Sequence, residues 1–143
     1  MKPIHYEALI RKAPFAYALH RIVLDEDSKP CDYVFLEINE AFERMTGLKA
    51  KNTVGKRVTE VLPDIGEDPF DWIAFYGEIA LNGGEKTFDQ RSDPLNRWYR
   101  VTVTSHETGL FSTIFYDISS EKRKSEELEQ FFSVNLDLLC IAD

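Results

Sequence analysis

Trp72 and Tyr76 are the residues whose types and spacing point most directly to a binding function. They stand four positions apart in an apolar segment, so on a helix they share one face. Two aromatic rings on one face could stack on the flat ring of a small organic ligand. The same pair would also serve as ordinary core, which is the commoner use of aromatic residues at helical spacing. The sequence leaves both interpretations open.

The histidines and cysteines do not form a recognisable metal or nucleophile site. His5, His20 and His106 lie in a leading segment, a strand and a turn, without acidic or cysteine partners at ligand spacing. We therefore interpret them as surface or edge histidines and expect no metal. Cys31 and Cys140 form no CxxC pair and are best interpreted as small apolar fillers.

Paired carboxylates could in principle carry out acid–base catalysis. Asp64 with Glu67, and Asp68 with Asp71, occupy turn and helix-cap contexts that explain them without catalysis. The sequence also lacks a GxSxG nucleophile elbow and a phosphate-binding glycine loop. We therefore expect no catalytic residues and no enzyme activity in this chain.

Length and charge restrict the possible partners. The 143 residues suit one domain, with 43% hydrophobic and 13% aromatic residues. The net charge of −8 opposes binding to nucleic acid. No apolar run approaches the ~20 residues that span a bilayer, and the N-terminus lacks a signal-peptide core. These features predict a cytoplasmic protein without membrane insertion.

The elements that would position these side chains are strands on both sides of a helical middle. Two strands, FAYALHRIVL and CDYVFLEI, flank the turn DEDSKP. A longer helix, FDWIAFYGEIALN, is predicted to begin at Asp68 and Pro69 and to stop at two glycines. Three further strands, KTFDQRS, RWYRVTVTS and LFSTIFYD, are separated by turns. Alternation in the last two strands places Tyr99, Val101 and Val103 with Phe111 and Phe115 on an inner face.

A short helix follows the second strand directly. In INEAFERMTGL, Asn39 can cap the helix, Phe42 and Met45 share a face, and Gly47 can end it. A helix this short is marginal alone and must pack against another surface. We expect it to cover the inner face of the sheet together with the longer helix.

Three stretches carry a family resemblance: VFLEINEAFERMTGL, VGKRVTEVLPDI, and RWYRVTV followed by FSTIFYDISSEKR. In this order and spacing, over about residues 14 to 124, they resemble a PAS domain with its C-terminal PAC motif, as found in bacterial sensor histidine kinases or diguanylate cyclases. The resemblance implies an α/β (α+β) fold with a five-stranded antiparallel sheet in the order 2-1-5-4-3. Short helices would cover one face, and a C-terminal signalling helix would follow.

The resemblance also implies an organisation along the chain and a route for the signal. We expect a cap helix at 1–13, a PAS sensor domain at 14–118, a signalling linker helix at 119–132 and the start of a truncated second PAS domain at 133–143. Asp117, Ile118 and Ser119 would relay a signal into the helix. Ile118, Ser125 and Phe132 recur every seven residues, which would suit a weak coiled-coil seam.

A ligand in such a module would lie between the sheet and the helices. The candidate pocket residues are Tyr17, Leu36, Phe42, Met45, Trp72, Tyr76, Phe88, Tyr99 and Phe115. The segment NTVGKRVTEVLP lacks the cysteine of flavin-photoadduct domains, and the longer helix lacks an axial histidine. Covalent flavin and haem are therefore disfavoured, a non-covalent small organic ligand remains possible, and the cofactor is unknown.

The expected function is that of a cytoplasmic PAS sensory and dimerisation module in a multidomain protein, most simply a sensor histidine kinase. A ligand-free structural module for dimerisation and relay is one alternative, and a PAS domain of a diguanylate cyclase is another. The expected partners are a second copy, through the terminal helices or the outer sheet face, and downstream PAS, kinase or cyclase domains of the same chain.

Overall fold

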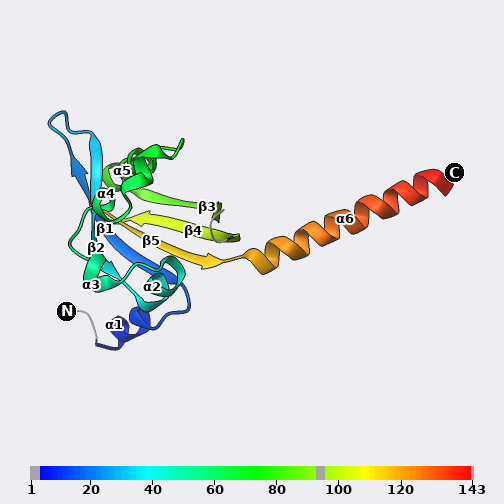
Figure 1. Ribbon diagram of the computed structural model, residues 1–143, viewed down its shortest axis with the longest axis horizontal. Coiled ribbons are helices and arrows are strands. Elements are labelled where there is room, and N and C mark those ends of the chain that lie inside the picture. The colour runs from blue at the N-terminus through cyan, green and yellow to red at the C-terminus, as the bar shows by residue number, and fades with distance from the viewer. Residues whose placement is uncertain (1–3, 93–95, 143) are drawn as a thin grey trace. The chain divides into compact units, whose positions relative to one another are not determined.

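The fold is built from five strands and a set of mostly short helices (Figure 1). The computed structural model describes the backbone of residues 4–92 and 96–142 and the side chains of residues 8–91 and 96–134. The elements are α1 (Ile4–Arg11), β1 (Ala16–Leu24), β2 (Pro30–Ile38), α2 (Glu40–Thr46), α3 (Ala50–Thr53), α4 (Val58–Val61), the 3₁₀ helix η1 (Pro63–Glu67), α5 (Trp72–Asn82), β3 (Gly84–Ser92), β4 (Arg97–Ser105), β5 (Leu110–Asp117) and α6 (Ser119–Ala142).

The strands form one antiparallel sheet in the order β2-β1-β5-β4-β3. The central strand β1 pairs antiparallel with β2 on one side and with β5 on the other. This topology confirms the predicted fold class and strand order. The first and last strands therefore lie side by side, which brings residues far apart in sequence into register, as in the pair His20 and Phe111, 91 positions apart.

Contacts divide the chain into two compact units. The first comprises the chain up to Phe88 together with Val101–Tyr116, and the second comprises Asp89–Arg100 together with the chain from Asp117 onward. The first unit contains β1, β2 and the helices α1 to α5, whereas α6 belongs to the second.

The buried face of the sheet follows the two-residue period of the strands. On β4, Val101 and Val103 are buried, and on β5 Phe111 and Thr113 are buried, while the residues between them are half-exposed. The predicted inward alternation of these strands is confirmed. On β1 the buried series is Ala16, Ala18, His20 and Ile22.

Asn39 fixes the junction between β2 and α2. It is 3% exposed, and its Oδ1 accepts hydrogen bonds from the backbone nitrogens of Phe42 and Tyr17, each at 3.0 Å. Its Nδ2 donates to the carbonyl oxygens of Ile10 at 2.8 Å and Phe15 at 3.0 Å. The residue predicted to cap the helix therefore makes four hydrogen bonds, which join α1, the start of β1 and α2.

The longer helix begins later than the sequence predicted. Asp71 caps α5 by accepting from the Ala74 nitrogen at 3.0 Å, so the first helical residue is Trp72. Asp68 instead closes a turn, accepting from the Phe70 nitrogen at 2.9 Å and from Trp72 Nε1 at 3.2 Å. The Asp-Pro pair forms this turn because aspartate readily bonds the amide two residues ahead.

Gly77 allows α5 to approach the start of β2 closely. A Cβ atom at this position would clash with the ring of Pro30 and would lie 3.4 Å from Ile22 Cδ1. The glycine lowers the intrinsic stability of the helix. We infer that it is required for this close packing.

The terminal helix α6 runs without a break from Ser119 to Ala142. It contains neither proline nor glycine, so no residue in it stops the helix at position 132. The start of a second PAS domain at 133–143 remains a prediction. Within the described residues, no helix combines the length and apolar character needed to cross a membrane.

Candidate functional site

Four aromatic rings from three elements form a stacked series in the first unit. Tyr76 on α5 stacks on Phe111 of β5, with ring centroids 5.0 Å apart and an interplanar angle of 14°. The Phe111 ring stacks in turn on His20 of β1, at 4.5 Å and 21°. Trp72 extends the series from Tyr76 at 5.8 Å and 30°. We call Trp72, Tyr76, Phe111 and His20 the ring ladder.

His20 occupies the sheet end of the ring ladder. It is 3% exposed, and its ring also meets Tyr33 and Phe35 edge-on at centroid distances of 4.9 and 5.0 Å. Its Nε2 lies 3.3 Å from Thr113 Oγ1, whereas its buried Nδ1 has no hydrogen-bond partner among the residues that the structure describes. Burial lowers the pKa of His20 from 6.5 to about 3, so the imidazole is neutral at physiological pH.

The tyrosines at the ring ladder, Tyr33 and Tyr76, are also uncharged at neutral pH. Burial raises the pKa of Tyr33 and of Tyr76, which keeps both phenols protonated. The buried carboxylate of Asp32 is engaged with other groups: Thr59 Oγ1 donates to it at 2.6 Å and Arg57 Nη1 lies 3.8 Å away. A group that binds among these rings would therefore avoid the cost of burying a charge only if it were neutral.

The structure brings five of the predicted pocket residues into one aromatic cluster. Trp72 and Tyr76 are members of the ring ladder, and Phe88 lies 5.9 Å from the Trp72 ring. Phe42 and Phe115 contact each other at 5.7 Å. Phe42 also contacts Phe35 at 6.1 Å, which joins this pair to the residues around His20.

The other four predicted residues are placed differently. Tyr17 alternates with the buried Ala16 and Ala18, so it lies on the opposite face of β1. Leu36 is the extra residue of a β-bulge, because Leu19 pairs with Glu37 and His20 with Phe35. Met45 is half-buried on α2, and Tyr99 belongs to the second unit.

Two residues of the ring ladder, His20 and Phe111, were not among the predicted pocket residues. The interpretation of His20 as a surface or edge histidine was wrong, because alternation with the buried Ala16 and Ala18 places it on the inner face. The same alternation would have identified Phe111 and Phe35 as its neighbours had the register been known. Of the other histidines, His106 is exposed and the side chain of His5 lies outside the described residues.

The predicted relay residues form a bonded junction within the second unit. Asp117 Oδ2 accepts from Arg97 Nη1 at 2.6 Å, and Asp117 Oδ1 accepts from the Ser119 nitrogen at 2.8 Å. Ser119 Oγ accepts from the Trp98 nitrogen at 2.9 Å, and the Ile118 nitrogen donates to the Trp98 oxygen at 2.8 Å. The hydrogen bond of the Ser119 side chain lowers the pKa of Asp117.

Asp89 forms a second set of contacts at the start of α6. It accepts from Arg100 Nε at 2.9 Å and lies 3.1 Å from Lys122 Nζ. The hydrogen bond from Arg100 is the largest of the effects that lower the pKa of Asp89. Lys122 Nζ also lies 4.8 Å from the centroid of the Trp98 ring. The first turns of α6 are thereby tied to β3 and β4 by charge and by a cation–π contact.

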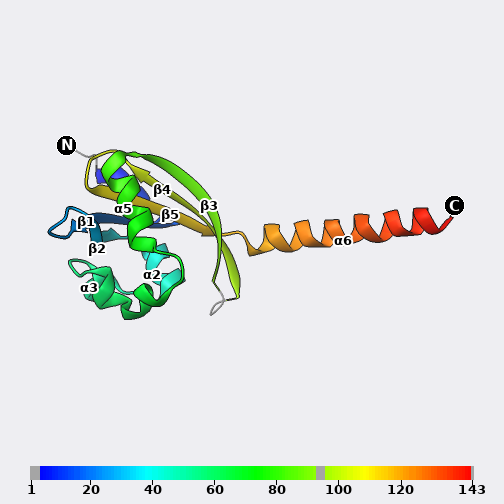
Figure 2. The same cartoon turned by 90° about the horizontal axis from the view of Figure 1, so that it is seen from above.

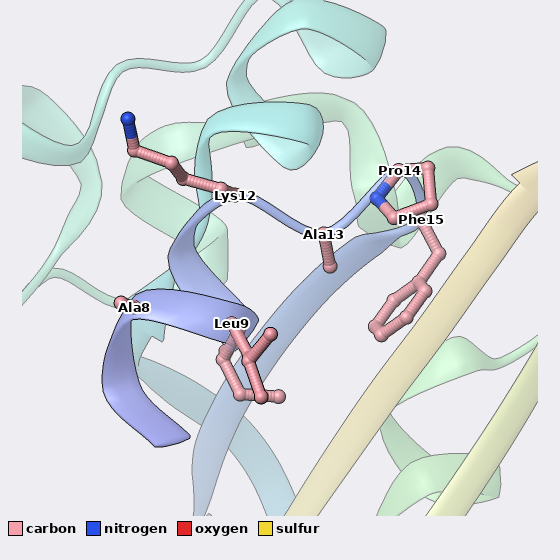
Figure 3. A pocket seen from close by; sticks show the side chains of 7 residues that line it. Ala8, Leu9, Lys12, Ala13, Pro14 and Phe15 are labelled. Carbon is pink, nitrogen blue, oxygen red and sulfur yellow. The ribbon is translucent and has the colours of Figure 1, made fainter. Parts of the chain in front are cut away.

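An open apolar hollow of about 790 Å³ lies beside α1. Its lining comprises Ala8, Leu9, Ile10, Lys12, Ala13, Pro14 and Phe15. Figure 3 shows the side chains of Leu9, Ala13 and Phe15 pointing to the same side. Leu9 is 67% exposed, so this hollow presents apolar surface to solvent.

The described residues offer no grouping of three or more metal-ligating side chains. Cys31 is exposed and unpaired with another cysteine, which corrects its interpretation as a filler. The side chain of Cys140 lies outside the described residues.

Comparison of the fold with solved structures identifies PAS and LOV domains. The structure of an RNA-binding Light-Oxygen-Voltage receptor matches with a TM-score of 0.59 and 18% identity, over 93% of this chain and 37% of that one. The LOV domain of the Erythrobacter litoralis EL346 blue-light activated histidine kinase matches at 0.45 and 19%, over 76% and 99% of the two chains. The PAS domain of Bordetella pertussis BvgS matches at 0.44 and 16%, over 94% and 92%.

These matches establish the fold alone, and that assignment rests on the first of them. The predicted PAS fold is confirmed. Neither a protein-family model nor a curated protein matches the sequence. The chain spans 37% of the length of the receptor.

Proposed function

We propose that this chain is the sensory module of a multidomain signal-transduction protein, and that it binds a small, neutral, flat organic molecule among the rings between α5 and the sheet. The observation that carries the proposal is the buried Nδ1 of His20 in the ring ladder, for which the described part of the chain offers no hydrogen-bond partner. Binding would change the packing of the sheet, and the junction at Asp117 would pass this change to α6.

The unpaired nitrogen of His20 favours a ligand over simple core packing. A buried polar atom without a hydrogen-bond partner costs about 1–3 kcal/mol, and such atoms are rare in folded proteins. Phenylalanine would fill an apolar stack without that cost. A ligand with one polar atom would satisfy Nδ1 and would stack on the neighbouring rings.

The contacts between the rings favour a second candidate, a ligand-free structural module. Centroid distances of 4.5 to 5.8 Å along the ring ladder mean that the rings already pack on one another. A ligand would have to displace a ring, and the one to move would be Trp72 or Tyr76 on α5. In the second candidate Nδ1 would bind a water molecule.

Native mass spectrometry and solvent extraction of the purified protein distinguish the two candidates. The ligand-binding proposal predicts a stoichiometric neutral aromatic compound, lost in His20→Phe and retained in the matched control His106→Phe, whose residue is exposed. The proposal fails if His20→Phe retains the compound. It also fails if nothing co-purifies and a library of neutral aromatic compounds leaves the thermal midpoint unchanged.

We also propose that two copies associate through their terminal helices. The apolar hollow beside α1 and the exposed Leu128, Phe132 and Val134 of α6, each 57 to 60% exposed, are surfaces that a second copy would cover. Light scattering of the purified chain should show a dimer that Leu9→Glu or Phe132→Glu weakens. A dimer unaffected by either change would point to the outer sheet face instead.

We propose further that the parent protein is a cytoplasmic sensor histidine kinase, with a diguanylate cyclase as the alternative, and that the present residues are not catalytic. Support for the last point is that Asp68 and Asp71 are engaged in a turn and a cap. The intact parent should show ATP-dependent histidine phosphorylation. Formation of cyclic diguanylate would support the alternative. If the parent shows neither activity, both assignments are wrong.

A further inference from the structure

One segment of this acidic chain is strongly basic. Residues 44–57 contain Arg44, Lys49, Lys51, Lys56 and Arg57 and no acidic residue, although the whole chain has a net charge of −8. All five side chains are exposed. Arg57 lies 3.8 Å from Asp32, whereas the other four have no ion pair with the described residues. The segment is therefore a concentrated and largely uncompensated positive charge.

This segment borders a hollow of about 380 Å³. Two of the basic residues, Lys49 and Lys56, line it together with Asn52, Thr53 and Glu60. The lining residues thus carry two ammonium groups, an amide and a hydroxyl, against the single carboxylate of Glu60. Ammonium, amide and hydroxyl groups are donors that recognise phosphate and carboxylate oxygens.

One wall of the hollow is held firmly by β2. The Phe35 nitrogen donates to the Lys56 oxygen at 3.0 Å, and the Gly55 nitrogen donates to the Phe35 oxygen at 2.8 Å. Val34 forms a further β-bridge with Arg57. The backbone that carries Lys56 is therefore fixed to the sheet.

A second part of the lining, Gly47 to Lys49, is fixed by the end of α2. Gly47 adopts φ 78° and donates to the Glu43 oxygen at 2.9 Å, which stops the helix. Glu43 Oε2 accepts from the Ala50 nitrogen at 2.7 Å, which sets the start of α3. Because both parts of the lining are bonded in place, the hollow is preformed, as ligand sites usually are.

We propose that this hollow binds a small anion carrying a phosphate group, such as a phosphorylated metabolite. The volume lies within the range of small-molecule sites, which begins at roughly 300 Å³. An extended polyanion such as RNA is disfavoured, because the rest of the chain is acidic and would repel it. The lining of this hollow includes no residue of the ring ladder, and the proposal does not depend on a ligand there.

Binding is tested by titrating the whole chain with inorganic pyrophosphate, using calorimetry and ¹⁵N-resolved amide shifts. We expect saturable shifts centred on Gly47, Asn52 and Thr53. Lys49→Gln and Lys56→Gln should each weaken binding about tenfold, which corresponds to roughly 1.4 kcal/mol. Lys49 makes no side-chain cap bond, so its replacement should leave the fold intact.

Charge-matched controls separate a site from general attraction. Lys29→Gln lowers the charge equally in an exposed turn and should leave the affinity unchanged. Glu60→Gln should tighten binding, whereas Glu26→Gln, which removes an exposed acid in the same turn as Lys29, should not. The proposal is overturned if pyrophosphate gives no saturable shift up to about 10 mM, because even a weak specific site has a dissociation constant below that concentration. It is also overturned if Lys29→Gln weakens binding as much as Lys49→Gln or Lys56→Gln does. Binding of single-stranded RNA in place of pyrophosphate would overturn it as well.

Discussion

Lowering the pH below 6.5 should lower the free energy of unfolding, because His20 is buried in its neutral form. The pKa of His20 is about 3 in the folded chain and 6.5 when unfolded, because burial disfavours the imidazolium. Between these values the unfolded chain binds a proton that the folded chain rejects. The contribution of His20 to stability is therefore complete above pH 6.5 and is lost as the pH falls from 6.5 towards 3.

The size of this effect follows from the two pKa values. Each pH unit in this window costs about 1.4 kcal/mol. Between pH 7.5 and pH 4.5 the loss attributable to His20 is therefore roughly 3 kcal/mol. That is a large fraction of the 5–15 kcal/mol that holds a typical domain folded.

The assay is urea unfolding at intervals of one pH unit from 7.5 to 4.5. Wild type and His106→Phe should lose stability more steeply than His20→Phe, because His20→Phe lacks the buried imidazole and keeps every other titrating group. If His20→Phe fails to fold, His20→Leu provides the same comparison. Parallel pH profiles for wild type and the His20 variants would refute the account of a buried neutral histidine.

Three further predictions concern packing, capping and the start of α6. Gly77→Ala should lower stability by about 1–3 kcal/mol despite its better helix propensity, because its Cβ meets Pro30; a raised thermal midpoint would contradict this. Asn39→Ala should lower the free energy of unfolding in urea by about 2–4 kcal/mol, and Asn39→Asp, which keeps the acceptor atoms but loses the donors, should lower it less. Equal losses in the two variants would contradict the role given to the four hydrogen bonds of Asn39. Asp89→Asn and Lys122→Gln should each speed amide hydrogen exchange in the first turn of α6, and unchanged protection would show that these charges do not hold the helix.

Local chemistry in the sequence was enough to predict several elements. Asn39 and Gly47 are typical of a helix cap and a helix stop, and both act so in the structure. Alternation predicted the buried series on β4 and β5, including Val103 and Phe111. These features depend on residues within a few positions of each other, so the period of the strand or helix is sufficient.

Features that depend on distant parts of the chain could not be predicted in this way. The bulge at Leu36 sets which β2 residue faces His20, and no local pattern announces it. The ring ladder also needs the pairing of His20 with Phe111 on the last strand. Tyr17 was among the predicted pocket residues, whereas its strand position directs it to the other face.

The segment at Gly55–Arg57 has a consequence for how the sheet can meet another chain. Strands β2 and β3 are the outer strands, and each would ordinarily offer unpaired backbone groups as a template for further strands. On β2 these groups are occupied at Phe35 and bridged at Val34. In the described part of the chain no comparable segment pairs with β3, whose sequence GEKTFDQRS is rich in charge. The backbone groups that stay open in the described residues are therefore those of β3, where the charges oppose pairing with a further strand. Two copies joined there would use up each other's open edge, so growth into a fibre would stop at the pair.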